Sequence, residues 1–121
     1  MFVDLVGSTR LSQRLSAEKM LEINHAYQEV VIQALEQYSG KLVRVVGDGL
    51  LTLFGWPNAH GDDPERAVRA AMAIHRDLAK LHLVEDTQLA CRIGIATGPS
   101  LVGDVQSGGL SQPGTVYGIT P

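Results

Sequence analysis

The feature that most constrains the fold is a pair of β-rich runs joined by a short turn in the middle of the chain. Lys41–Val46 and Leu50–Phe54 flank the tripeptide Gly47-Asp48-Gly49. A short Asp-Gly connection between two such runs is the strongest local signal of a β-hairpin. The centre of the chain is therefore predicted to form two antiparallel strands that are neighbours in a sheet.

Helical patterns lie on both sides of this hairpin. Before it, apolar residues recur at intervals of three and four from Ser16 to Tyr38, with Ser16 placed to cap the helix and Gly40 placed to end it. After it, Asp63-Pro64-Glu65 carries the usual start signals of a second helix. The apolar positions of this second segment form one narrow face suited to lying on a sheet: Ala67, Ala71, Ile74, Leu78 and Leu81.

A strand is predicted near each outer end of this pattern. Met1 to Val6 is apolar apart from Asp4, and it runs into a turn at Gly7-Ser8-Thr9. Leu89 to Thr97 alternates in the manner of a strand with a well buried face. The glycine-rich residues that follow are expected to form hairpins and turns.

The resulting order is strand, helix, strand, strand, helix, strand. This order predicts an α/β (α+β) fold with a ferredoxin-like βαββαβ core, in which a mixed, mostly antiparallel sheet carries two packed helices. Right-handed crossovers make the first and second strands parallel, so the end of the first strand and the hairpin turn fall at the same edge of the sheet. Asp4 and Asp48 are therefore expected to be neighbours.

Length and charge limit the classes of function. The 121 residues suit one domain, and 10 Lys and Arg against 13 Asp and Glu give a net charge of -3 without a basic stripe. No nucleic-acid partner is therefore expected. Cys91 is the single cysteine, and the sequence has neither a long apolar run nor a signal-peptide pattern, so we expect a cytoplasmic chain without a direct membrane segment.

Two carboxylates at a strand end, beside a turn with open backbone amides, suit a divalent cation that carries a phosphate ligand. Mg²⁺ takes oxygen ligands, usually one or two from carboxylates and the rest from phosphate and water. Asp4 and Asp48 each have a structural explanation as well, as a residue that caps a turn and a good hairpin-turn residue. An acid inside the apolar run Phe2–Val6 favours the functional explanation, because packing alone would prefer valine there.

Three segments together resemble a known family. They are Phe2–Thr9, Val46–Leu51 with Phe54 downstream, and Arg92–Pro99, and they place Asp4, Asp48 and Arg92 at equal intervals. In this order they look like the signature segments of the class III adenylate/guanylate cyclase catalytic domain. The resemblance covers residues 1–121 and identifies them as one partial domain of this family.

The resemblance implies roles for individual residues. Asp4 and Asp48 match the catalytic, metal-binding aspartates, and the Leu5 carbonyl matches a backbone ligand of the second of two metal ions, Mg²⁺ or Mn²⁺. Triphosphate binding is expected from the turn and from a strand arginine: Leu5, Val6, Gly7, Ser8, Thr9 and Arg92. Arg44 and Thr115 match the positions that read the base, but Arg44 stands where adenine-specific members have lysine, and the two side chains are not equivalent at a directional contact.

The implied reaction converts ATP, in preference to GTP, to a 3′,5′-cyclic nucleotide and pyrophosphate by a two-metal mechanism. The family works as a head-to-tail dimer, so we expect a homodimer or pairing with a second cyclase domain. The family's Asn and Arg that steady the transition state follow the segment matched by Thr115–Pro121, so the 121-residue chain alone is expected to turn over little or nothing.

Two alternatives stay open. One is a catalytically inactive cyclase-like domain that regulates or dimerises, favoured by Arg44 and opposed by the presence of both aspartates. The other is a different two-metal nucleotidyl transferase on a similar sheet, such as a polymerase palm or a diguanylate cyclase. The Gly7-Ser8-Thr9 turn and the Arg92–Pro99 segment oppose this second alternative.

Overall fold

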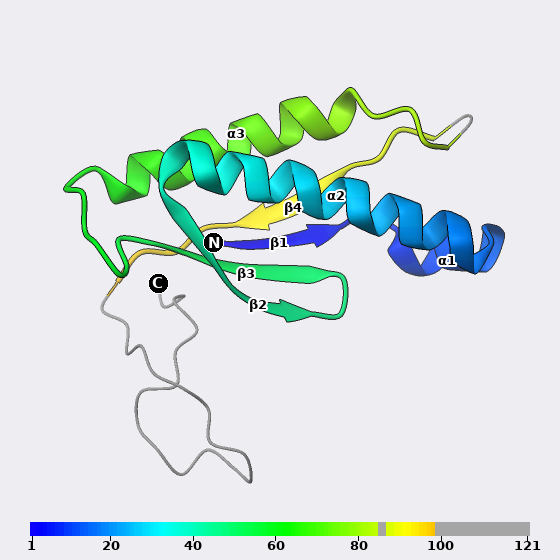
Figure 1. The fold of residues 1–121 in the computed structure, drawn as a ribbon, viewed down its shortest axis with the longest axis horizontal. Coiled ribbons are helices and arrows are strands. Elements are labelled where there is room, and N and C mark those ends of the chain that lie inside the picture. The colour runs from blue at the N-terminus through cyan, green and yellow to red at the C-terminus, as the bar shows by residue number, and fades with distance from the viewer. Residues whose placement is uncertain (85–86, 99–121) are drawn as a thin grey trace, which may run out of the picture.

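The computed structural model describes residues 1–84 and 87–98. Figure 1 shows a sheet with helices packed against it. The elements follow in the order β1 (Phe2–Leu5), α1 (Ser8–Arg14), α2 (Ala17–Tyr38), β2 (Gly40–Val46), β3 (Gly49–Phe54), α3 (Asp63–Ala79) and β4 (Cys91–Gly94). The predicted C-terminal turns and Thr115 lie outside the described residues.

The strand order is β2-β3-β1-β4, which is the order of a ferredoxin-like core. The predicted fold is therefore confirmed. Each pair of adjacent strands within the described ranges is antiparallel, so the sheet is antiparallel there and not mixed. The reason is that β3 lies between β1 and β2, the two strands that run in the same direction.

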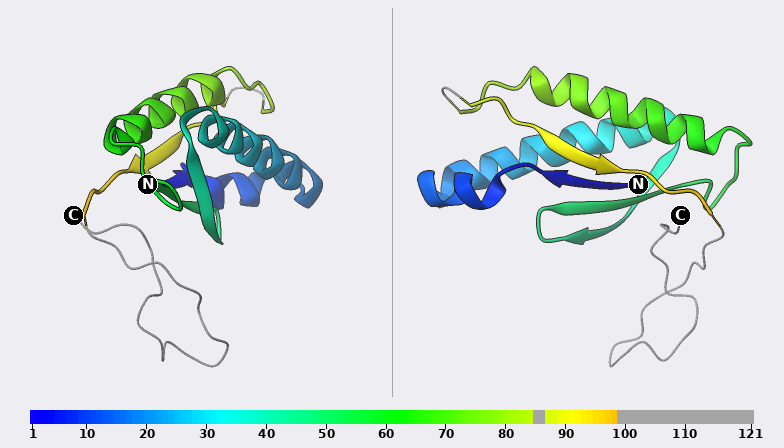
Figure 2. Two further views of the ribbon diagram at one scale, coloured as in Figure 1. Left: turned by 60° about the vertical axis from the view of Figure 1, so that its left-hand side comes forward. Right: turned by 180° about the vertical axis from the view of Figure 1, so that it is seen from behind.

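The hydrophobic core lies between one face of the sheet and the helices α2 and α3, which lie side by side on that face (Figure 2). Val3, Leu5 and Leu50 supply the sheet side, and Ile23 and Ile74 are among the fully buried helix residues. Burial of each such side chain contributes roughly 1.5–3 kcal/mol. In residues 1–84 and 87–98 no helix is long and apolar enough to cross a bilayer.

The ends of α2 follow the sequence signals only in part. Ser16 caps the helix as predicted, because its Oγ accepts a hydrogen bond from the Lys19 amide at 3.1 Å. The left-handed residue that ends the helix is Ser39, with φ of 61°, and not Gly40. Gly40 instead begins β2, where an added Cβ would lie 2.6 Å from both the Leu35 side chain and the Phe54 ring, so a larger residue there would have to displace these side chains.

Strand β2 has an irregularity that was not predicted. Leu42 pairs with Thr52 while Arg44 pairs with Leu51, so Val43 is an extra residue in the ladder. A bulge of this kind changes which face the following residues occupy. With regular alternation after Leu42, Arg44 would fall on the helix-covered face, whereas the bulge puts it on the opposite face with Leu51.

Candidate functional site

The predicted site residues come from three neighbouring strand ends. Asp4 pairs in register with Gly49 on one side and with Arg92 on the other. Gly49 directly follows Asp48, so the topology brings Asp4 and Asp48 to one end of the sheet, as the crossover argument predicts, and Arg92 lies at the same end. Directly paired residues share a face, and for Asp4 and Arg92 this is the face away from α2 and α3.

The carbonyl oxygen of Leu5 points toward β3, the strand that begins after Asp48. The Val6 amide donates to the Ala90 carbonyl at 2.8 Å, on the β4 side of the chain. Backbone groups of an antiparallel strand alternate between its two neighbours, so the carbonyl of Leu5 faces β3 instead. The donor set at this strand end therefore comprises two carboxylates and one carbonyl oxygen.

The turn after β1 is held open by a glycine. Gly7 has a φ of 70°, a left-handed backbone conformation that residues other than glycine rarely adopt. The Val6 amide is already engaged by Ala90, so this part of the expected triphosphate-binding turn is not open to a ligand. Of the predicted turn residues, Gly7, Ser8 and Thr9 keep open amides, because the first residues of a helix have no preceding carbonyl to bond.

A hydrogen bond joins this turn to the hairpin. The Ser8 hydroxyl donates to Oδ2 of Asp48, across 40 positions of sequence. Sequence reasoning used only the backbone of Ser8 and missed this contact, because the helix α1 that presents the hydroxyl was not predicted. The bond fixes one oxygen of the Asp48 carboxylate against the start of α1.

A cavity of about 480 Å³ lies beside the turn, lined by Val6, Gly7, Thr9, Arg10, Gln13 and Arg92. It brings Arg92 together with the predicted turn residues. Arg10 and Gln13 were missed by sequence reasoning. Their three-residue spacing would place them on one face of a helix, but seven mostly polar residues give no hydrophobic period from which to recognise α1.

Of the two residues expected to read a base, Arg44 does not line this cavity. Arg44 lies on β2, two strands away from β1, on the helix-free face of the sheet. Thr115 lies outside the described residues. Residues 1–84 and 87–98 hold no cluster of three or more His, Cys, Asp or Glu that would form an all-protein metal cage.

Tyr27 of α2 lies in the core on the other face of the sheet. Its side chain is 1% exposed, and its hydroxyl is buried without a hydrogen-bond partner in the described structure. Burial raises the pKa of this phenol, and the negative charges of Cys91, Asp4 and Asp48 raise it further. The carboxylates at the strand end are thus close enough to act on the core electrostatically.

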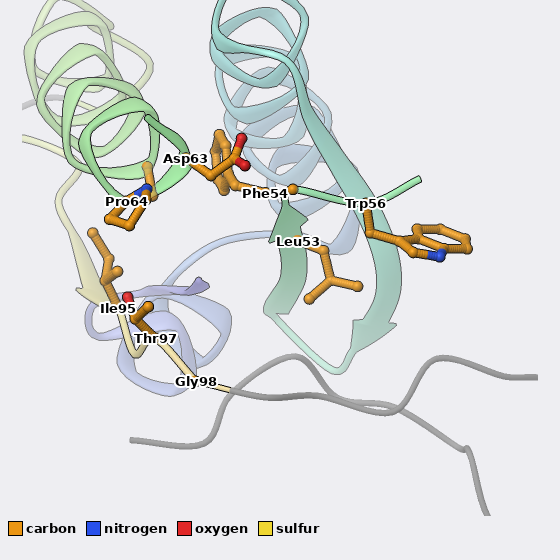
Figure 3. Close-up of a pocket in the computed structure, with 10 residues that line it drawn as sticks. Leu53, Phe54, Trp56, Asp63, Pro64, Ile95, Thr97 and Gly98 are labelled. Carbon is orange, nitrogen blue, oxygen red and sulfur yellow. The ribbon is translucent and has the colours of Figure 1, made fainter. Parts of the chain in front are cut away.

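A second cavity, of about 280 Å³, lies at the opposite end of β3 (Figure 3). Leu53, Trp56 and Ile95 are among its lining residues, as is Asp63 at the start of α3. The Asp63 carboxylate is engaged locally, since its Oδ2 accepts from the His60 amide at 2.9 Å. Among the residues that the structure describes, none of the predicted site residues lines this cavity.

The fold and the strand-end residues define a ferredoxin-like α/β domain with paired carboxylates next to an arginine-lined cavity. Residues 1–113 match the family described as the adenylate and guanylate cyclase catalytic domain. The chain belongs to this family, and the resemblance found in the sequence is confirmed.

Individual relatives agree with this assignment. An uncharacterized protein of Mycobacterium tuberculosis is 31% identical over 104 residues, which cover 86% of this chain and 19% of that protein. The crystal structure of the guanylyl cyclase Cya2 has a TM-score of 0.79 at 28% identity, covering 99% of this chain and 61% of that one. The adenylyl cyclase CyaB from P. aeruginosa has a TM-score of 0.74 at 29% identity, covering 84% and 56%. The chain thus spans only about a fifth of the length of that curated relative.

Proposed function

We propose that this chain is a nucleotide cyclase domain that converts ATP, in preference to GTP, to a 3′,5′-cyclic nucleotide and pyrophosphate. The observation that carries the proposal is the strand register, which sets Asp4 opposite Arg92 and next to the residue that follows Asp48. Carboxylates for a metal and a guanidinium for a phosphate are the two kinds of group that a metal-bound triphosphate needs.

The donor set fits two divalent ions, Mg²⁺ or Mn²⁺. Such ions are usually held by one or two carboxylates together with substrate phosphates and water, so the absence of a third acidic ligand in the described ranges agrees with this chemistry. Asp4 and Asp48 would hold the ions, with the Leu5 carbonyl as a backbone ligand. When bound, the ions supply activation of the ribose 3′-hydroxyl and neutralisation of the leaving group.

The residues of the chain would bind and orient the triphosphate. Arg92 and the amides of Gly7, Ser8 and Thr9 would hold the phosphate oxygens on the cavity side of the strand end. The 3′-hydroxyl loses its proton to water, and its oxygen forms a bond to the α-phosphorus while the bond from that phosphorus to the bridging oxygen breaks, so that pyrophosphate leaves. The 3′-hydroxyl and the α-phosphate belong to the same nucleotide, so the protein needs only to orient them for in-line attack.

Pairing of two chains would complete the site. In this proposal Arg44 and Thr115 read the base bound at the metal site of a second copy or of a second cyclase domain. The bulge in β2 supports a role at an interface, because it keeps Arg44 on the same helix-free face as Asp4 and Arg92. A cytoplasmic location, where nucleoside triphosphates are available, is part of the same proposal.

A catalytically inactive, nucleotide-binding member of the family is the second candidate. Arg44 favours it, because a planar guanidinium is not equivalent to a lysine ammonium at a directional base contact. This candidate predicts binding of a metal-bound nucleotide without formation of a cyclic product.

The test combines binding and turnover. The chain is titrated with ATP and with GTP in the presence of Mn²⁺, and cyclic nucleotide and pyrophosphate are measured in parallel. Asp4→Ala and Asp48→Ala should each weaken Mn²⁺-dependent nucleotide binding by about tenfold or more, since even the outer partners of metal ligands matter by 10–100-fold. Removal of the metal with EDTA should have the same effect on the wild-type chain.

The matched control is Asp77→Ala, which removes the same charge from a half-buried position on α3, away from the strand end. It should leave nucleotide affinity within about twofold of wild type. Binding that survives in both site variants, or that persists in EDTA, would show that the two-metal assignment is wrong. Because the 121-residue chain alone is expected to turn over little or nothing, binding without product agrees with either candidate, whereas formation of cyclic nucleotide would reject the inactive one.

A further inference from the structure

Some lysines and arginines of this chain have an interaction partner in the described structure, and others do not. Most lysines and arginines pair with an acid or lie over an aromatic ring, as Lys19 does with Glu22, Arg66 with Asp62, Arg69 with Glu65, Arg76 and Lys80 with Asp77, and Lys41 with Trp56. Arg44 has an interaction of its own. Arg10, Arg14 and Arg92 are the cations without a partner among the described residues.

These unpaired arginines gather around one turn. Arg92 and Arg10 line the cavity of about 480 Å³. Arg10 and Arg14 line an adjoining cavity of about 300 Å³, which shares Val6 and Gly7 with the first. In a chain of net charge -3, cations that are left without acids and placed together form a local region suited to a multiply charged anion.

We propose that Arg10 is a second phosphate-binding arginine of this site and that it holds the terminal phosphate of a triphosphate. This inference rests on the proposed function. Arg92 faces Asp4 in register, so it lies near the phosphates next to the metal ligands. Arg10 approaches the same cavity from α1, and it also borders the neighbouring cavity, which places it toward the far end of a bound triphosphate.

The chemistry of the side chain suits this role. A guanidinium presents a planar set of donors that matches two phosphate oxygens at once, and an ammonium does not. Arg10 would therefore distinguish a triphosphate chain from a shorter one, because only the longer anion reaches it. Arg14 lies one helical turn further along α1 and lines only the adjoining cavity, so it provides a matched control on the same helix.

The test uses inorganic anions, so that it does not depend on recognition of a base. The wild-type chain is titrated with tripolyphosphate and with pyrophosphate in Mg²⁺ buffer, followed by Arg10→Ala, Arg10→Lys and Arg14→Ala. Arg10→Ala should weaken tripolyphosphate binding by about tenfold or more and pyrophosphate binding by less than about twofold. Arg10→Lys should be intermediate for tripolyphosphate, and Arg14→Ala should stay within about twofold of wild type for both anions.

Equal affinities of Arg10→Ala and wild type for tripolyphosphate would overturn the inference. So would an equal loss for both anions, which would indicate a general charge effect, or a wild-type chain that binds neither anion. Parallel titrations with ATP and GTP test the proposed function separately. An Arg10-dependent preference for tripolyphosphate in a chain that binds no nucleotide would leave the inference standing and reject the proposed function.

Discussion

A single hydroxyl in the core makes a stability prediction possible. The phenol of Tyr27 is buried with no hydrogen-bond partner in the described structure, and this arrangement costs the desolvation energy of a polar group. Its pKa is raised above the ordinary value of 10.0, so the folded chain holds the proton more tightly than the unfolded chain does. The associated stability is present below pH 10 and is lost as the pH rises beyond it.

We therefore expect Tyr27→Phe to fold at least as stably as wild type at pH 8 and to lose less stability between pH 10 and pH 11. The measurement is the urea-unfolding free energy across this pH range. Cys91 contributes in an overlapping range, because burial raises the pKa of its thiol from 9.0 to about 11, so both chains are compared in a Cys91→Ala background. Tyr38→Phe is the control. A wild-type curve with the same alkaline slope as the Tyr27→Phe curve would contradict the assignment.

Residue by residue, the sequence predicts backbone-determined neighbours better than side-chain contacts. The approach of Asp4 to the Asp48 turn follows from topology, since strand direction and hairpin position are enough to derive it. The Ser8 to Asp48 hydrogen bond and the position of Arg10 depend on α1, and this helix has only Leu11 buried. Because α1 buries a single apolar residue, its sequence shows no helical period of apolar residues from which the helix could be predicted.

Among the elements, β2 shows how a strand keeps a charged residue out of the core. Val43 is the extra residue, so Arg44 pairs with Leu51 on the helix-free face. Alternation of residue types cannot reveal such a shift, because the side chains of Lys41 to Val46 are compatible with either register. The long helices were predictable for the opposite reason, since Ser16 supplies a cap and buried residues recur through α2.

The bulge predicts a contrast between two deletions. Deleting Val43 should remove the bulge while Leu42 and Arg44 keep their partners, so the unfolding free energy should change by no more than about 1 kcal/mol. Deleting Val45 should either shorten the turn at Asp48 or move Arg44 to the helix-covered face, and it should cost at least about 2 kcal/mol more.

Both valines are exposed, at 38% and 51%, so the two deletions remove similar groups and differ mainly in register. Urea denaturation of the two variants gives the comparison. Equal losses of stability would mean that the bulge does not set the position of Arg44.

At the scale of the whole molecule, α2 and α3 cover one face of the sheet (Figure 2), and the strand register places Asp4, Arg92 and Arg44 on the other face. Asp4 and Arg92 belong to one row of that face, and Arg44 lies in a neighbouring row toward the far edge. A site that needs both ends of this face is more readily assembled from two chains than from one. This placement of the residues is the physical reason for proposing that two chains pair.

Mixing two defective chains tests the pairing. Asp4→Ala removes a metal ligand and Arg44→Ala removes a base contact, so each variant alone should bind ATP weakly. In an equimolar mixture, random pairing restores about a quarter of the wild-type number of tight ATP sites, because half of the pairs are mixed and each has one intact site. Titration calorimetry counts these sites.

The control mixture combines Asp4→Ala with Asp48→Ala. Both changes affect the same half of the site, so no tight site should return. Recovery in the control mixture, or none in the test mixture, would refute a site shared between two chains.

The hydrogen bond from Ser8 to Asp48 has a thermodynamic consequence for ligand loading. The Asp48 carboxylate accepts a hydrogen bond from Ser8, the first residue of α1, and is also proposed to hold a cation. The turn that contains Ser8 is proposed to bind phosphate. Any ligand that draws Asp48 away from Ser8 changes the free energy of the turn, and the turn's own ligand changes the free energy of the carboxylate. Linkage requires the two effects to be equal, so cation affinity and phosphate affinity would each report on the other.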